Sequence, residues 1–269
     1  MHELLRPRAG LEREVTGAAH KPPLRLHRQA FHEDPALDVA ISRAILLRVA
    51  DGELPETMRI TRPPAMVAFG RQDVAGEHYL EGVRAARQSG FEAIERLAGG
   101  RAAVFHEQTL AIAHARPDRN PQAHIYPRFE EASEWIRAAC AELGVDARVG
   151  EVPGEYCPGG YSVNARGQKK LAGIGQKLIK GAGHLGGVLV VENGARVRGV
   201  LVPVYLGLGL EWNPSTAGSV ADELPGITLD DAEQALIEGL SANYEIEDAP
   251  LDPETLEIAR TLAPEHRSP

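Results

Sequence analysis

Three short strand-like runs, at 91–96, 102–105 and 109–115, follow one another and are separated by glycine-containing or polar residues. On either side, the segments 36–50 and 127–143 repeat their apolar residues at the spacing of an amphipathic helix. Strands and one-sided helices can bury their apolar faces together by packing the helices on a sheet. The pattern predicts an α/β fold of the α+β type, with a mixed β-sheet flanked by helices.

The same periodicity predicts the other elements. Asp34 is placed to cap the first helix, and Cys140 falls on the apolar side of a later one, where we expect a buried thiol. Helices are expected at 36–50, 76–89, 127–143 and 229–244, and strands at 58–62, 66–69, 91–96, 102–105, 109–115, 147–149, 161–164, 170–178 and 185–192. The segment 196–206 fits either a helix or an extended conformation.

Length and composition fit one soluble enzyme. The chain has 269 residues, 43% of them hydrophobic and 25% charged, which is enough for a large domain with its own core. Two cysteines provide no disulfide framework and fit a reducing compartment. No apolar run approaches the ~18 residues of a membrane span, and a net charge of −9 disfavours general nucleic-acid binding. We expect a cytoplasmic enzyme without membrane or nucleic-acid partners.

The segment 157–176 carries a thiol and two neighbouring ammonium groups. Cys157 becomes a nucleophile as its thiolate, and a nearby cation such as Lys170 favours that charged form. The glycines between them let backbone amides approach a reacting carbonyl, where an oxyanion needs donors. Lys169 competes with Lys170 for this role, and a single cysteine is more often a small core residue. The pairing makes acyl transfer a candidate chemistry.

A second glycine-rich segment lies upstream, with the sequence RLAGGRAAVFH from 96 to 106. Two arginines, Arg96 and Arg101, bracket the paired glycines Gly99 and Gly100, and the segment ends at His106. Paired glycines more often form a hairpin turn, and a histidine after a strand is more often a buried core group. The alternative is a loop that lines an acyl pocket.

Three motifs occur in a fixed order: Gly70-Arg71 with the two residues that follow, the glycine-rich segment, and KLAGIGQ at 170–176. This order resembles the biotin/lipoate protein ligase superfamily, and its lipoate-protein ligase A family in particular. Within it the chain is most similar to the cysteine-dependent octanoyltransferases of lipoate biosynthesis, because Arg101 stands where ATP-using ligases usually have a third glycine. The resemblance implies the biotin/lipoate ligase catalytic-domain fold.

The resemblance also implies a division of the chain. The catalytic domain would cover 36–225, after an N-terminal extension at 1–35 and before a C-terminal helical extension at 226–269. Ligases of the superfamily often carry an accessory domain, whereas only 44 residues follow Pro225. This favours a transferase.

As the resemblance implies, Cys157 would accept an octanoyl group from acyl carrier protein and pass it to a lysine of a lipoyl-domain protein or of the glycine-cleavage H protein. Lys170 would lower the pKa of the thiol and hold the acyl carbonyl. The thioester donor carries the driving force, so no cofactor is expected. Substrate binding is assigned by the resemblance to Arg71, Arg96, Gly99, Gly100, Arg101, His106 and Gly173.

Other functions stay open. An ATP-dependent lipoate-protein ligase would use ATP and Mg²⁺ and leave Cys157 incidental; a carrier-protein or lipoate-binding protein would have lost the chemistry; and a thiol hydrolase would pair Cys157 with His106 or His184. The sequence has no nucleotide-binding glycine signature and no metal-ligand spacing, so no metal is expected. A run of cations without an acid is either a solvated face or a surface that attracts an acidic carrier protein. It comprises Arg166, Lys169, Lys170, Lys177 and Lys180.

Overall fold

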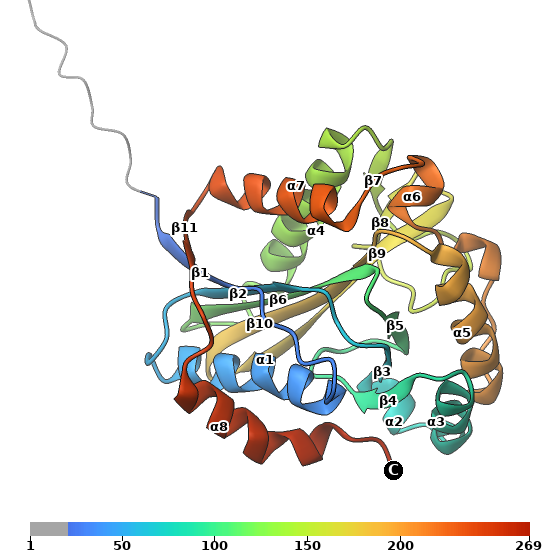
Figure 1. Cartoon of the computed structure of the whole chain (residues 1–269), viewed down its shortest axis with the longest axis horizontal. Coiled ribbons are helices and arrows are strands. Elements are labelled where there is room, and N and C mark those ends of the chain that lie inside the picture. The colour runs from blue at the N-terminus through green and yellow to red at the C-terminus, as the bar shows by residue number, and fades with distance from the viewer. Residues whose placement is uncertain (1–20) are drawn as a thin grey trace, which may run out of the picture.

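The computed structural model describes residues 21–269; the part of the expected N-terminal extension at 1–20 lies outside the described residues. A large mixed sheet lies between two layers of helices, and a smaller sheet stands at one end (Figure 1). From one edge to the other, the strands of the large sheet are β11 (Glu245–Asp248), β1 (Pro23–His27), β2 (Thr57–Thr61), β6 (Thr109–Asp118), β10 (Gly181–Val190), β9 (Lys169–Ile179), β8 (Val163–Ala165) and β7 (Ala147–Val149).

The pairing directions make this sheet mixed, as predicted. β1 runs parallel to both β2 and β11, whereas every other neighbouring pair, from β2·β6 to β7·β8, is antiparallel. The segments before residue 36 and after residue 225 thus each add an edge-side strand to the sheet. β8 pairs with β9 only as far as Ala172, so the rest of β9 has no strand on that side.

Helices cover both faces of the large sheet (Figure 1). α4 (Ile125–Glu142) and α7 (Leu229–Ser241) lie on one face, and α1 (Pro35–Ala50) and α8 (Pro253–Leu262) lie on the other. Asp34 caps α1 by accepting a hydrogen bond from the Leu37 backbone N–H, and Pro35 occupies the first turn, where its missing N–H costs nothing. The predicted start of this helix is therefore confirmed.

The smaller sheet consists of β4 (Glu92–Glu95), β3 (Met66–Phe69) and β5 (Ala103–Phe105), with β3 in the middle. The three consecutive strand-like runs are all strands, but they are divided between two sheets, because only β6 joins the large one. Helices and short turns complete the fold: α2 (Arg71–Val74), α3 (Tyr79–Gln88), α5 (Gly194–Gly207), α6 (Val220–Glu223) and the 3₁₀ turns Pro214–Thr216 and Ala263–His266.

Several element boundaries differ from expectation. The helix expected at 76–89 begins only at Tyr79, because Gly76 closes the turn that follows α2 by donating to the Asp73 carbonyl. The ambiguous segment 196–206 is helical, and β1, β11 and α8 were not foreseen. Cys140 is fully buried between α4 and the sheet, and burial raises the pKa of its thiol to about 12, which confirms it as a core residue. Among residues 21–269, no helix is long and apolar enough to span a membrane.

Candidate active site

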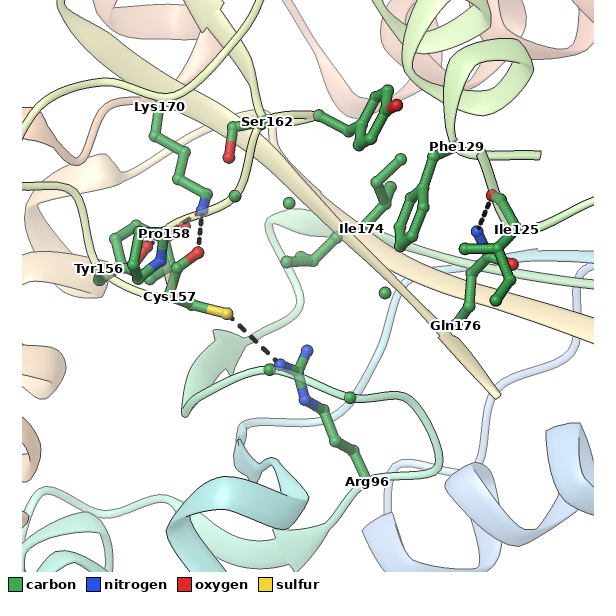
Figure 2. Close-up of a pocket in the computed structure, with 18 of the residues that line it drawn as sticks. Arg96, Ile125, Phe129, Tyr156, Cys157, Pro158, Ser162, Lys170, Ile174 and Gln176 are labelled. Carbon is green, nitrogen blue, oxygen red and sulfur yellow. Dashed lines mark hydrogen bonds between the residues drawn. The ribbon is translucent and has the colours of Figure 1, made fainter. Parts of the chain in front are cut away.

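A cavity of about 480 Å³ lies along β9 where that strand has passed the end of β8. Figure 2 shows the cavity between Cys157 and Lys170 on one side and Gln176 and Ile125 on the other. Phe129 of α4 stacks on Tyr161 with ring centroids 5.0 Å apart and forms an apolar wall. The lining also includes Arg96, Gly99, Gly100, Tyr156, Gly173, Ile174, Gly175 and Val188. A largely apolar cavity that begins at a thiol can hold an acyl chain.

Cys157 has a backbone conformation that side-chain-bearing residues rarely adopt. Its φ of 42° lies in the left-handed region, which costs roughly 1–2 kcal/mol for a residue with a Cβ. Two side chains fix this conformation: the Tyr205 hydroxyl accepts a hydrogen bond from the Cys157 N–H at 2.8 Å, and the Lys170 ammonium donates to the Cys157 carbonyl at 2.7 Å. Strain that is held in place by neighbours is characteristic of functional residues.

Lys170 is buried, at 1% exposure, and is held on all sides. Its ammonium donates to the carbonyl oxygens of Tyr156 at 3.0 Å and Cys157 at 2.7 Å, and to Oε1 of Glu155 at 3.0 Å. Glu155 is also buried, and it accepts three further hydrogen bonds from the same loop, from the Val152 and Gly159 N–H groups and the Ser162 hydroxyl. The ion pair therefore organises the loop that carries the nucleophile.

The Cys157 sulfur faces away from Lys170, toward the glycine-rich loop (Figure 2). Sγ lies 3.5 Å from Nη2 of Arg96 and accepts a hydrogen bond from the Arg101 backbone N–H at 3.2 Å. Burial alone would raise the pKa of Cys157, but the charges of Arg96 and then Lys170, together with these hydrogen bonds, outweigh it and lower the pKa. The thiol is thus set to ionise more readily than a free cysteine.

Two glycines allow this loop to approach the sulfur. A Cβ on Gly100, whose φ is +98°, would lie 2.6 Å from Nη2 of Arg96 and 2.9 Å from the Cys157 sulfur. A Cβ on Gly70 would lie 1.8 Å from the Gly100 carbonyl oxygen. Beneath them, the buried Asp73 carboxylate accepts from the Gly70 N–H at 3.1 Å and from the Arg101 guanidinium at 3.3 Å. The motif that begins at Gly70 thus packs against the glycine-rich loop and fixes its position.

Gly100→Ala is expected to destabilise the fold by more than about 1 kcal/mol and to slow alkylation of Cys157, because alanine tolerates neither the positive φ nor the closeness of Arg96. Gly99→Ala is the matched control, since its Cβ would meet nothing closer than the Gln176 carbonyl oxygen at 4.0 Å. Urea denaturation and iodoacetamide labelling measure the two effects. Equal behaviour of the two variants would contradict this account of the loop.

The structure brings together most of the residues assigned from the sequence. Cys157, Lys170, Arg96, Gly99, Gly100 and Gly173 all line the cavity. Arg101 reaches Cys157 through its backbone, whereas its side chain turns to Asp73. Arg71 is exposed in a separate groove, and His106 is fully buried outside the cavity lining, where burial lowers its pKa to about 4.

The histidines and the cationic run considered in the sequence lie mostly outside the cavity. His184 lies in β10 beside a different small cavity, so neither of the histidines considered for a thiol hydrolase lines the Cys157 site. The cationic run is only partly free: Lys170 is buried, Lys169 donates to the Ser215 carbonyl, and Arg166 pairs with Glu223 at 2.8 Å. Lys177 and Lys180 remain exposed.

Sequence reasoning missed Glu155 and Tyr205. Glu155 lies in an irregular loop, where no periodicity marks a buried acid, and Tyr205 is one of several apolar residues on the inner side of α5. Their roles depend on contacts that form only in the folded chain. Within residues 21–269, no group of three His, Cys, Asp or Glu side chains is placed to hold a metal ion.

A family model described as the lipoyl protein ligase A/B catalytic domain matches residues 34–241. The mixed sheet carries one cavity at which a cysteine, a buried lysine and a glycine-rich loop meet. Together with this match, that arrangement defines an enzyme of the acyltransferase class. The chain belongs to the lipoyl protein ligase A/B catalytic domain family. This confirms the resemblance read from the three motifs.

Curated relatives are named octanoyl-[GcvH]:protein N-octanoyltransferase. The protein of Geobacillus kaustophilus is 28% identical over 208 residues, which are 77% of this chain and 69% of the relative. That of Oceanobacillus iheyensis is 24% identical over 75% of both chains, and that of Exiguobacterium sibiricum is 31% identical over 54% of this chain and 52% of its own. The chain thus spans between half and three quarters of these relatives.

Solved structures that share this fold include lipoate-protein ligases. One, lipoate-protein ligase A bound with ATP, superposes with a TM-score of 0.71 over 90% of this chain and 95% of its own, at 18% identity. A bipartite ligase from Thermoplasma acidophilum, reported with its E2 lipoyl domain, gives 0.69 over 91% and 93%, also at 18% identity. The predicted ligase-type fold is confirmed.

Proposed function

We propose that this chain is an octanoyltransferase of protein lipoylation that works through an acyl-enzyme on Cys157. The observation that carries the proposal is the Cys157 sulfur, which lies at the head of an apolar-walled cavity and within 3.5 Å of a guanidinium and an amide N–H. The names of the curated relatives support the octanoyl group as the cargo. Burying its chain contributes roughly 5 kcal/mol, at about 0.8 kcal/mol per CH₂.

The reaction has two displacements. The Cys157 thiolate attacks the octanoyl carbonyl, and the bond from that carbonyl to the donor atom breaks. A thiol donor leaves as its thiolate, and an amine donor takes up a proton from solvent as it leaves. The acceptor lysine then attacks the thioester as a neutral amine, releases a proton to solvent, and displaces Cys157 as the thiolate again. The Arg101 N–H, already directed at Sγ, is placed to donate to the oxyanion of both steps.

Two donors fit this chemistry. The resemblance of the motifs implies octanoyl-acyl carrier protein, whose thioester drives the transfer. The relatives' names point to the octanoylated H protein, whose amide is exchanged for another amide. We propose the octanoylated H protein as the preferred donor, and a lipoyl-domain lysine as the acceptor. Neither donor requires ATP or Mg²⁺. The acyl carrier protein donor carries an activated thioester, and the H protein donor carries an amide equivalent to the amide that is formed.

The test mixes the enzyme with a lipoyl-domain acceptor in EDTA without nucleotide, and supplies either octanoyl-H protein, octanoyl-acyl carrier protein, or free octanoate. Mass spectrometry of the acceptor is expected to show octanoylation from the protein donors and none from free octanoate. If the protein donors give no modification, and a parallel reaction with free octanoate, ATP and Mg²⁺ does, the chain is a ligase. If no donor is used while lipoyl domain binds, it is a binding protein.

A further inference from the structure

We infer that Arg96 is a catalytic residue, the counter-ion in direct contact with the Cys157 thiolate, and that Lys170, whose charge acts on the thiol without a hydrogen bond to it, also anchors the backbone of the nucleophile. The inference rests on the proposed function in one respect only, that Cys157 is the nucleophile. It gives Arg96, which the resemblance assigns to substrate binding, a direct role at the thiol.

The position of Arg96 is fixed at both ends. Its backbone N–H donates to the Phe69 carbonyl at 2.9 Å, just after β4 ends, and its Nη2 donates to the Arg101 carbonyl at 2.7 Å. Nη2 then lies 3.5 Å from the Cys157 sulfur, in the space that Gly100 leaves free by having no side chain. A guanidinium stays charged at every pH at which a thiol titrates, so it is a constant partner for a thiolate.

Lys170 has no hydrogen left for the sulfur. An ammonium has three donors, and those of Lys170 are used by Glu155 and by the carbonyls of Tyr156 and Cys157. The Glu155 carboxylate, buried with it, also offsets its charge. The Lys170 ammonium donates to the Cys157 carbonyl, and the Tyr205 hydroxyl accepts from the Cys157 N–H. These two hydrogen bonds maintain the strained φ of 42° at Cys157.

Other charged and titratable groups pack around the sulfur from several elements. They are Arg101 and Asp73 from the glycine-rich loop and α2, Glu155 and Tyr156 from the nucleophile's own loop, Lys170 from β9 and Tyr205 from α5. Burial raises the pKa of both tyrosines, so they stay neutral. Arg101 pairs with Asp73 as Lys170 pairs with Glu155, which leaves the guanidinium of Arg96 in contact with Sγ and with no acidic partner in the described ion pairs.

The test titrates the thiol of the free enzyme, with neither donor nor acceptor present. Thiolate absorbance at 240 nm and the rate of iodoacetamide alkylation are followed against pH, with Cys157→Ser as the blank. Arg96→Gln is expected to move the midpoint up by at least about one unit, so that alkylation at neutral pH slows about tenfold. Arg96→Lys, which keeps the charge, should retain most of the low midpoint. Added methylguanidinium should restore the alkylation rate of Arg96→Ala.

Arg119→Gln is the matched control, because it removes an exposed arginine that lines neither the Cys157 cavity nor the groove beside Arg96. An unchanged midpoint in Arg96→Gln, with melting temperature preserved, would overturn the inference, as would a larger shift in Lys170→Gln than in Arg96→Gln. If Arg96→Gln does not fold, the inference is tested by the other two variants. It is wrong if Arg96→Lys loses the low midpoint and methylguanidinium does not restore the alkylation rate of Arg96→Ala. Because no substrate is used, a chain with no octanoyltransferase activity still gives this result, so the two proposals fail separately.

Discussion

Cys157→Ser is expected to lower octanoyl transfer by at least about 10³-fold and to leave no stable octanoyl adduct on the enzyme. A serine hydroxyl ionises far less readily than a thiol, so it needs a neighbouring base to become a nucleophile. Neither His106 nor His184 lines the cavity, and Arg96 cannot accept a proton. The serine variant therefore keeps the shape of the site and loses its reactive group. Peptide mass spectrometry after incubation with the donor, and acceptor octanoylation over time, measure both effects.

Cys140→Ala is the matched control for this prediction. Cys140 is fully buried in the core beneath α4, and its thiol has a pKa of about 12, so it cannot act at neutral pH. The control variant should keep its rate of transfer and its adduct on Cys157, with some loss of stability from the cavity it leaves. Transfer by Cys157→Ser within about tenfold of the wild-type rate would remove the acyl-enzyme from the mechanism.

Local patterns predicted the elements whose causes are local. The helix Pro35–Ala50 was foreseen because its cap at Asp34 and its apolar periodicity lie within the segment itself. The strand Pro23–His27 was missed, because it is a strand through pairing with Glu245–Asp248, more than 200 residues away. This strand lies inside the edge strand β11, and its two buried leucines, Leu24 and Leu26, are too few to identify a strand by alternation alone.

The site residues likewise divide into those with a local sequence signal and those that depend on distant contacts. The glycines, Cys157 and Lys170 could be identified from motifs, because each motif is continuous in the sequence. The contact between Arg96 and the Cys157 sulfur joins residues 61 apart, and the spacing of the motifs does not reveal it. Glu155 is close to the nucleophile in sequence, but a buried acid in an irregular loop resembles any surface acid until its partners are known.

Lys170→Ala is expected to destabilise the fold by about 3–5 kcal/mol and to abolish transfer, whereas the neighbouring Lys169→Ala should change stability by less than about 0.5 kcal/mol. Removing Lys170 leaves the Glu155 carboxylate buried without its cation, and it also releases the Cys157 carbonyl. Lys169 makes one hydrogen bond, to the Ser215 carbonyl, from a partly exposed position, so its loss is mild. The free energy of unfolding in urea and the rate of acceptor octanoylation measure the difference.

A double variant, Lys170→Met with Glu155→Gln, shows whether the cost comes from the unpaired charge. Replacing both partners removes the buried charges together, so this variant should recover a substantial part of the stability that Lys170→Ala loses. It should not recover transfer, because methionine cannot donate to the Cys157 carbonyl and the strained backbone of the nucleophile loses its anchor. If Lys169→Ala proved the more damaging single change, in stability and in activity, the lysine of the site would be Lys169, and the role assigned to the buried pair would be wrong.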